Sequence, residues 1–472
     1  MWEDLNERFG QGASGVLVAA LAACLIAAPF ARDAEAAGAE SSALSDEPIP
    51  LKTEEELPER TPPLIEIGPD FLGTGNIPPG IELPTGAVWT PALWIFGDYR
   101  TAVNYFDNGD APAVGEWANR LDIFANFQFS GTERLLFGME PLHDGADFTG
   151  YRWRPGDDDF RTGGLNGDIT TFFFEGEFGE IFPKLDPDDT GSFDYGFAVG
   201  RQPIFFQEGM MFNDTIDSIG ITRDTVVIPG ASVDTRITAL FGWDEVHRND
   251  NNEDDDAFVI GLFTETDFRP TTTSFDIAYV FSDDDDGGDG LFIGASATQR
   301  IGHWNTAVRG NLSVATGDES DAVSTGGLLF AETSRTLPYS DDVVYLNAFW
   351  GIDDFASAAR DELAGGPLGR VGLLFAAVGL GAYGAPLSNQ AQDVVGGSLG
   401  HQWFFNDHRT QVVLEAGGRI GTDSDVDHAV AVGGRVQQAV GARTLLRLDA
   451  FASAQENQDK GVGARAEVML RF

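Results

Sequence analysis

Charged side chains stand at alternate positions in many segments whose intervening positions are apolar. In the final segment, Arg465, Glu467 and Arg471 share one face of a strand, and Phe472 ends the opposite, apolar face. Charges that project into a narrow aqueous passage attract or repel solutes, because the electric field is concentrated there. Chosen on this basis, the candidate pore-lining residues are Arg100, Arg120, Asp122, Arg201, Arg236, Arg309, Glu415, Arg419, Arg435, Arg447, Asp449, Arg465 and Glu467.

Two interpretations of these charges stay open. Opposite charges on neighbouring strands would form cross-strand ion pairs that stabilise the interior. Alternatively, the arginines would form a ladder that selects anionic solutes, since guanidinium stays ionised in confined sites and binds carboxylate or phosphate with two hydrogen bonds.

Runs of acidic residues suggest either solvated loops or weak cation sites. Ca²⁺ needs several oxygen ligands at short spacing, but no run carries the glycine and terminal glutamate of a calcium loop. Solvated loops are the favoured interpretation. We therefore expect no metal and no cofactor, with Ca²⁺ binding in these loops as the alternative; the runs are 157–159, 186–189, 250–256, 283–286 and 423–427.

No set of residues predicts catalysis. Gly396 to Gly400 fits the G-x-S-x-G pattern, but that motif needs a turn from strand to helix, and here an alternating pattern continues to Phe405. The histidines form no recognisable pair of base and nucleophile. We predict that the chain is not an enzyme and has no catalytic residue, with an outer-membrane hydrolase as the alternative from another class.

The elements that would position these charges are short strands with period-two alternation, separated by turns rich in Gly, Asp, Asn and Pro. Single-chain bacterial barrels have even strand numbers, so the nineteen candidates predict sixteen or eighteen strands, with eighteen favoured. The candidates are 92–106, 118–129, 132–142, 168–182, 193–202, 219–228, 233–245, 256–268, 272–282, 290–302, 303–316, 324–335, 342–352, 371–382, 393–405, 409–421, 427–439, 442–454 and 461–472.

The connections alternate between short and long, as in barrels that have short periplasmic turns and long extracellular loops. Short links include 130–132, 269–271, 406–408 and 441–442. Long acidic connections, predicted to be extracellular, are 143–167, 183–192, 246–256 and 353–368.

A closed antiparallel barrel in lipid explains the repeated apolar face better than a soluble sandwich does. A sandwich needs a second sheet to cover each apolar face, whereas a membrane barrel needs none and leaves no unpaired strand edge. The fold prediction is therefore an all-β transmembrane barrel.

The N-terminus predicts export. Residues 15–30 are apolar, and Ala34, Glu35 and Ala36 form a small-x-small cleavage pattern. We predict a signal peptide at 1–36, a flexible acidic and Pro-rich tail with its lead-in at 37–88, and the barrel at 89–472. Two alternatives stay open: a retained anchor, and a lipidated Cys24.

The chain has 472 residues and a formal net charge of -46, which argues against a nucleic-acid partner. Its one cysteine, Cys24, would leave with the signal peptide, so we expect no disulfide in the mature protein.

Residues 465–472 resemble the last strand of bacterial outer-membrane porins, which ends in a phenylalanine read by the barrel-assembly machinery. Residues 199–202, followed by Phe206 and Gly209, are similar to the Gly-Arg-Gln strand end of alginate-export and related substrate-selective porins. The resemblance implies location in the outer membrane of a Gram-negative cell, with lipid, lipopolysaccharide and the assembly machinery as partners and Phe472 as the assembly signal.

The predicted function is passive or weakly selective diffusion of small hydrophilic solutes, including anionic ones. The alternatives are export of an anionic polysaccharide such as alginate, and a structural or adhesion barrel that conducts nothing. The sequence leaves the oligomeric state open.

Overall fold

The computed structural model describes residues 60–73, 78–109, 111–145, 147–154, 161–188, 190–282, 287–338 and 340–472. The chain divides into two units, Met1–Arg60 and Thr61–Phe472, and the second holds the described strands. The predicted signal peptide, Cys24 and the tail up to residue 59 lie outside the described residues. The lead-in contains three short strands, β1 (Ile65–Ile67), β2 (Ile81–Glu82) and β3 (Val88–Trp89), of which β1 pairs with β4.

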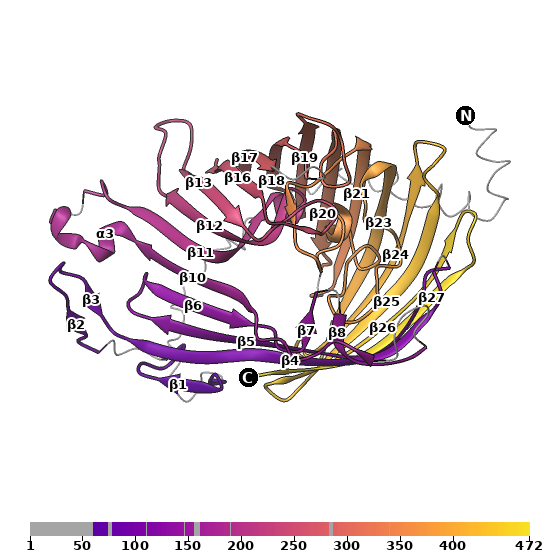
Figure 1. Ribbon diagram of the computed structural model, residues 1–472, viewed down its shortest axis with the longest axis horizontal. Helices are drawn as coiled ribbons and strands as arrows, with labels where there is room; N and C mark the ends of the chain where they lie inside the picture. Colours follow the sequence, from indigo (N-terminus) through magenta and orange to yellow (C-terminus); the bar gives the residue numbers. More distant parts are fainter. Residues whose placement is uncertain are drawn as a thin grey trace, which may run out of the picture. The chain divides into compact units, whose positions relative to one another are not determined.

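In the described chain, 18 antiparallel strands close into one barrel (Figure 1), which confirms the favoured count. The sheet closes where β27 pairs with β4, and there the backbone N–H and C=O of Phe472 both bond to Gly97, at 3.0 Å each. The barrel strands are β4 (Ala92–Asp107), β5 (Val114–Gln128), β6 (Arg134–Met139), β10 (Ile169–Glu177), β11 (Tyr195–Phe206), β12 (Phe212–Arg223), β13 (Asp234–Asp244), β16 (Ala257–Asp267), β17 (Thr271–Ser282), β18 (Gly290–Ile301), β19 (Trp304–Ala315), β20 (Gly326–Thr336), β21 (Val343–Asp354), β23 (Gln392–Phe405), β24 (Thr410–Gly421), β25 (Ala429–Val440), β26 (Thr444–Gln455) and β27 (Gly461–Arg471).

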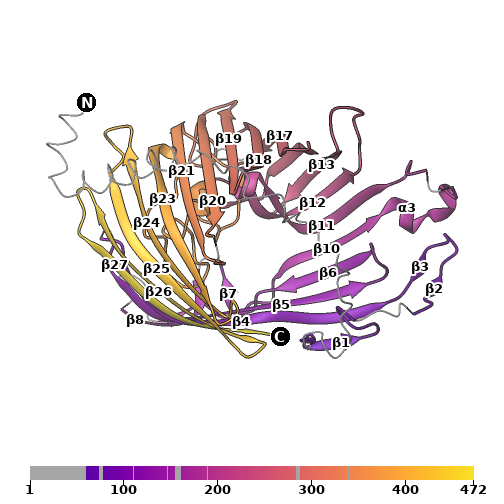
Figure 2. The same cartoon turned by 180° about the vertical axis from the view of Figure 1, so that it is seen from behind.

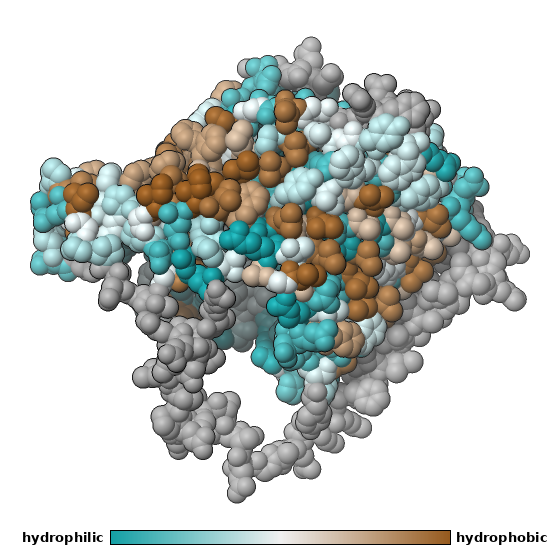
Figure 3. All heavy atoms as spheres, turned by 90° about the horizontal axis from the view of Figure 1, so that it is seen from below, coloured by the Kyte–Doolittle hydropathy of each residue, from teal (hydrophilic) through white to brown (hydrophobic). Residues whose placement is uncertain are grey.

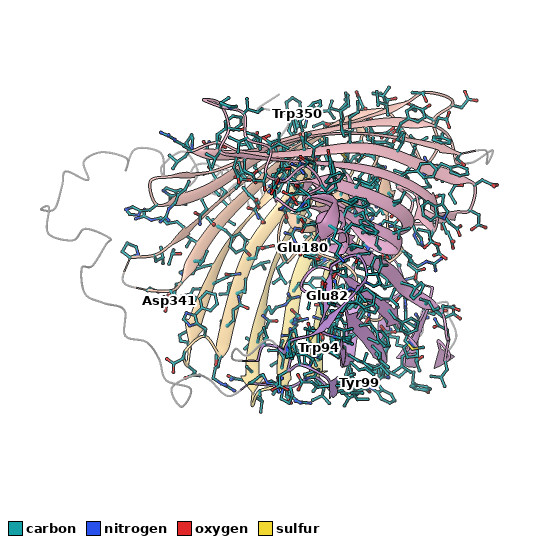
Figure 4. The ribbon with its side chains drawn as sticks, turned by 90° about the vertical axis from the view of Figure 1, so that its left-hand side faces the viewer. Glu82, Trp94, Tyr99, Glu180, Asp341 and Trp350 are labelled. Carbon is teal, nitrogen blue, oxygen red and sulfur yellow. The ribbon has the colours of Figure 1, made fainter. Side chains whose placement is uncertain are left out.

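The alternation of each strand separates an apolar outer face from a polar inner face. Val103 and Trp117 are about half exposed on the outside, whereas Arg465 and Glu467 are buried inside. Trp350 lies at the outer edge of the wall in Figure 4, and Figure 3 shows apolar patches over the outer surface. A closed barrel with an apolar exterior is the arrangement that spans a membrane with strands. Separately, no helix in the described ranges is long and apolar enough to cross a membrane.

The two ends of the barrel differ in their connections. One end, here the turn end, carries the short links 129–133, 302–303, 406–409 and 441–443. The other, the loop end, carries the long connections, which contain β7 (His143–Asp144), β8 (Asp147–Arg154), β9 (Arg161–Thr162), β14 (Val246–His247) and β15 (Glu253–Asp254).

One predicted external loop lies at the opposite end. The connection that contains 183–192 joins β10 to β11 and includes α3 (Phe178–Ile181) and η3 (Pro183–Leu185). Because β10 runs from the loop end to the turn end, this connection belongs to the turn end. Strand direction, which sequence composition does not report, decides the end at which a loop emerges.

The predicted strand 371–382 is wrong. These residues belong to the connection 355–391, here the lumen loop, which carries β22 (Ala359–Arg360) and η5 (Pro367–Arg370). Val371, Leu374, Phe375 and Leu380 are at most 1% exposed, because they pack against inward side chains of the barrel. In Figures 1 and 2 the orange segment after β21 runs inside the ring of strands. The apolar residues that suggested a lipid-facing strand instead fill the interior.

A second element also enters the interior. β11 pairs with β10 only up to Arg201, and β12 pairs with β13 only from Asp217. Between these points, residues 202–216 pair mainly with each other, and we call them the inner hairpin; its tip is η4 (Gln207–Gly209). The hairpin joins the lumen loop through a short parallel pairing of Phe212 with Ala359.

Candidate functional site: the luminal surface

Eight of the predicted lining residues lie together on the inner face of five adjacent strands, β25, β26, β27, β4 and β5. On β25, β26, β27 and β4 their opposite charges form a ladder of ion pairs, whereas Arg120 and Asp122 pair with each other on β5. The contacts are Arg435–Asp449 at 2.5 Å, Arg465–Asp449 at 2.7 Å, Arg465–Glu467 at 2.8 Å, Arg100–Glu467 at 2.8 Å, Arg447–Glu467 at 3.4 Å and Arg120–Asp122 at 3.0 Å. Four of these six contacts join neighbouring strands, and the pairs Arg465–Glu467 and Arg120–Asp122 lie within one strand.

The lumen loop covers part of this ladder. The guanidinium of Arg100 donates to the carbonyl oxygens of Val378 and Gly379, at 3.2 Å each. The ring of Tyr383 lies 5.6 Å from the guanidinium carbon of Arg465, within the range of a cation–π contact. The side chains of Arg465 and Glu467 are 0% and 1% exposed as a result. These two charges contact protein rather than a water-filled passage.

Glu415 and Arg419, also predicted to line the pore, anchor the lumen loop to β24. The carboxylate of Glu415 accepts hydrogen bonds from the backbone N–H of Leu373 at 2.9 Å and of Leu374 at 2.8 Å. Arg419 donates to the carbonyl oxygen of Ser388 at 2.6 Å. Both residues are on the inner face, but their side chains form hydrogen bonds with the backbone of the lumen loop.

Arg309 on β19 connects the wall to the inner hairpin. Its guanidinium lies 2.8 Å from Glu332 and 3.7 Å from Glu208 at the hairpin tip. Glu208 also lies 2.7 Å from Arg370 of the lumen loop, so the carboxylate bridges wall and loop. Sequence reasoning missed Glu208 and Arg370, because neither lies in an alternating strand.

Arg236 faces inward and remains open to solvent. It lies 2.5 Å from Asp224 and 3.8 Å from Glu265, and its side chain is 55% exposed. Among the predicted residues it is therefore well placed to meet a solute.

Arg201 differs from the prediction. It has the parity of the exposed outer residue Val199, so it lies on the outer face of β11. There it pairs with Asp217 at 3.0 Å and Glu245 at 2.6 Å, at the point where the inner hairpin leaves the wall. The sequence segment has too few alternating neighbours to reveal which face points inward.

Three cavities surround the inner hairpin and lumen loop. The turn-end cavity, of about 640 Å³, lies between β18–β25 and residues 369–376. The hairpin cavity, of about 290 Å³, includes Glu208, Arg236 and Arg309, and the wall cavity, of about 580 Å³, lies between β4–β5, the hairpin and the loop. The turn-end and hairpin cavities share the lining residue Thr298, and the hairpin and wall cavities share Phe205, so the three cavities are neighbours within the lumen.

A fully buried arginine fastens the two inner elements to each other. Arg360, which sequence reasoning missed, donates to Ser357 Oγ at 3.1 Å, to the carbonyl oxygen of Gly365 at 3.1 Å and to that of Gly209 at the hairpin tip. Arg360 stands within an apparently ordinary acidic loop, so no sequence pattern marks it. Its contacts hold the hairpin tip against the loop.

The structure places the two motifs that bear on enzyme or metal chemistry. Ser398 of the G-x-S-x-G match lies within β23, is 3% exposed and donates to the carbonyl oxygen of Val371 at 2.7 Å, a poor position for a nucleophile. Oxygens of Asp244, Glu253 and Asp255 lie within 4.8 Å of one another. Exposed carboxylates gather in this way without an ion, so Ca²⁺ stays an untested expectation.

The environment of His247, in the connection between β13 and β16, makes the stability of this connection depend on pH. Burial opposes protonation of its imidazole, but the hydrogen bond at 2.9 Å and the charge of Asp214 outweigh burial and raise its pKa to about 9. A raised pKa means that protonated His247 stabilises the fold fully below its unfolded pKa of about 6.5, and this contribution is lost as pH rises through about 9. We expect limited proteolysis of 245–256 to accelerate between pH 7 and pH 10. The variant His247→Gln should remove most of this acceleration, and an unchanged pH response in that variant would contradict the assignment.

Comparison with known proteins supports the fold without assigning a family. No family model and no curated protein matches the sequence. Among solved structures, a BenF-like porin from Pseudomonas fluorescens Pf-5 matches with a TM-score of 0.53 and 12% identity, over 80% of this chain and 98% of that chain. The outer membrane protein OpdK from Pseudomonas aeruginosa matches with a TM-score of 0.51 and 11% identity over the same shares, and a structure of OpdK with vanillate matches similarly, at 0.51 and 12%. The chain therefore has the fold of the outer-membrane porin barrels.

Proposed function

We propose that this protein is an outer-membrane channel through which small hydrophilic solutes diffuse. The observation that carries the proposal is a closed barrel whose outer face is apolar and whose inner face is charged and hollowed by neighbouring cavities. In this proposal lipid and lipopolysaccharide surround the barrel. The assembly machinery reads Phe472, whose backbone completes the seam between β27 and β4.

The passage would be narrow and weakly selective. The inner hairpin and the lumen loop occupy much of the interior, so solute size is limited by these elements rather than by the barrel diameter. The arginines are paired with carboxylates or bound to backbone, and carboxylates outnumber guanidiniums among the residues lining the three cavities. We therefore propose weak selectivity in place of an anion preference set by a free arginine ladder.

Conductance in planar bilayers tests the proposal. We expect stepwise currents in KCl, and a reversal potential that changes little when Arg309, Arg435 and Arg447 are all replaced by glutamine. Heat-modifiable gel mobility would show that the variant barrel is folded. Folded protein that inserts into bilayers but gives no stepwise current would refute the channel. A strong anion preference that disappears in the triple variant would show that these arginines do select anions.

A further inference from the structure

The turn-end cavity differs from the other two in its chemistry. Side chains on the inner faces of seven strands contribute amides and hydroxyls to it, and the lumen loop covers it at Gly369, Arg370 and Leu373. Its volume, about 640 Å³, lies within the range of about 300–1,000 Å³ that is common for small-molecule sites. The uncharged inward polar side chains are Thr298, Asn305, Ser334, Tyr345, Asn347, Gln402, Gln411 and Gln437.

The charged residues at this cavity are already neutralised by partners. Glu332 lies 2.8 Å from Arg309, Arg370 lies 2.7 Å from Glu208, and Arg435 lies 2.5 Å from Asp449. An incoming ion would have to compete with these pairs, whose separation would cost their mutual attraction. Among its described lining residues, the cavity therefore offers no unpaired charge to an incoming ion.

Several uncharged groups, in contrast, remain available. Within the described residues, the side chains of Asn305 and Gln402 make no hydrogen bond to protein, and Asn305 is exposed. Gln411 accepts from Gln437 at 2.5 Å, which leaves the amide N–H groups of Gln411 free. An amide offers both donors and acceptors, as does each hydroxyl of a polyol.

We propose that the turn-end cavity is a weak binding site for uncharged polyhydroxylated solutes, such as neutral saccharides. This inference rests on the proposed channel function and names its solute class. Asn305 and Gln402 face the cavity from β19 and β23 and contact the solute hydroxyls, while the compensated charges at the rim disfavour ions. Binding there slows passage transiently.

The test measures interruption of KCl current in planar bilayers by maltose, by its anionic oxidation product maltobionate and by the cationic glucosamine dimer. We expect maltose to block reversibly at a lower concentration than either charged probe. The double variant Asn305→Leu and Gln402→Met should raise the half-blocking concentration of maltose about tenfold, because two hydrogen bonds are removed without leaving a buried partner unsatisfied.

The matched control is Gln299→Met, a glutamine on β18 whose position next to Thr298 gives it the opposite, outer face. We expect this variant to keep the wild-type response to maltose. Tighter block by a charged probe, or an unchanged half-blocking concentration in the double variant, would overturn the saccharide site while leaving the channel intact. Loss of all KCl current in the wild-type protein would instead refute the channel itself.

Discussion

Replacing residues 355–391 with a short turn is expected to raise single-channel conductance about threefold or more, because conductance depends on the free cross-section at the narrowest part of a pore. The buried side chains of this segment, including Phe375 and Leu374, occupy the interior between opposite walls. Their removal would replace packed side chains with water and electrolyte.

The barrel wall offers a natural place for this deletion. Asp354 at the end of β21 and Gln392 at the start of β23 are register partners, so a turn of two to four residues can join them. The groups that now bind the loop, such as Glu415 and Arg419, would face water after deletion and could be hydrated. We therefore expect the barrel to close and the cavities to merge.

A deletion elsewhere provides the control. The connection 422–428 between β24 and β25 also lies at the loop end, and most of its residues are exposed. Replacing it with a two-residue turn should leave conductance close to the wild-type value. If the lumen-loop deletion folds, as judged by heat-modifiable mobility, and conducts no more than this control, the loop does not set the constriction.

Strand pattern in the sequence predicted the barrel, and together with the even strand number of single-chain barrels it predicted sixteen or eighteen strands, with eighteen favoured. The final segment is a clear example, because strict alternation from Gly461 to Phe472 leaves one choice of inner face. The lumen loop could not be predicted in the same way. Residues 371–382 are as apolar as a membrane strand, and only the surrounding barrel determines that their partners are inward side chains rather than lipid.

The candidate site was predictable where charges lie on regular strands and was missed where they lie on inserted elements. Arg100 and Glu467 are far apart in sequence, yet alternation places both inside, and the closure of the barrel brings them to 2.8 Å. Glu208, by contrast, lies two residues beyond the end of β11 in a left-handed conformation, with φ of 53°, so strand periodicity does not predict the direction of its side chain. The positions of side chains on the inserted loops depend on tertiary packing, which the local sequence pattern does not reveal.

Replacing Glu467 with glutamine is expected to destabilise the barrel by about 3 kcal/mol or more, since breaking a buried ion pair leaves uncompensated charge. The Glu467 carboxylate lies within 3.4 Å of Arg100, Arg447 and Arg465, and its side chain is 1% exposed. Glutamine keeps the size and some hydrogen bonds. Among the described residues, however, it leaves Arg100 and Arg447 without an ion-pair partner, and Arg465 keeps only Asp449. Urea unfolding in lipid vesicles, followed by tryptophan fluorescence, measures the loss.

The control is Glu265→Gln, which removes the same charge from a different inward position. Glu265 and Arg236 are both 55% exposed and lie 3.8 Å apart, so water screens their attraction and we expect a loss below about 1 kcal/mol. Equal losses in the two variants would mean that the ladder around Glu467 is hydrated and contributes little. A large loss confined to Glu467→Gln would mean that the predicted pore charges act mainly to hold β4, β26 and β27 together at the seam where the barrel closes. Selection of solutes would then depend on the uncharged groups beneath the lumen loop.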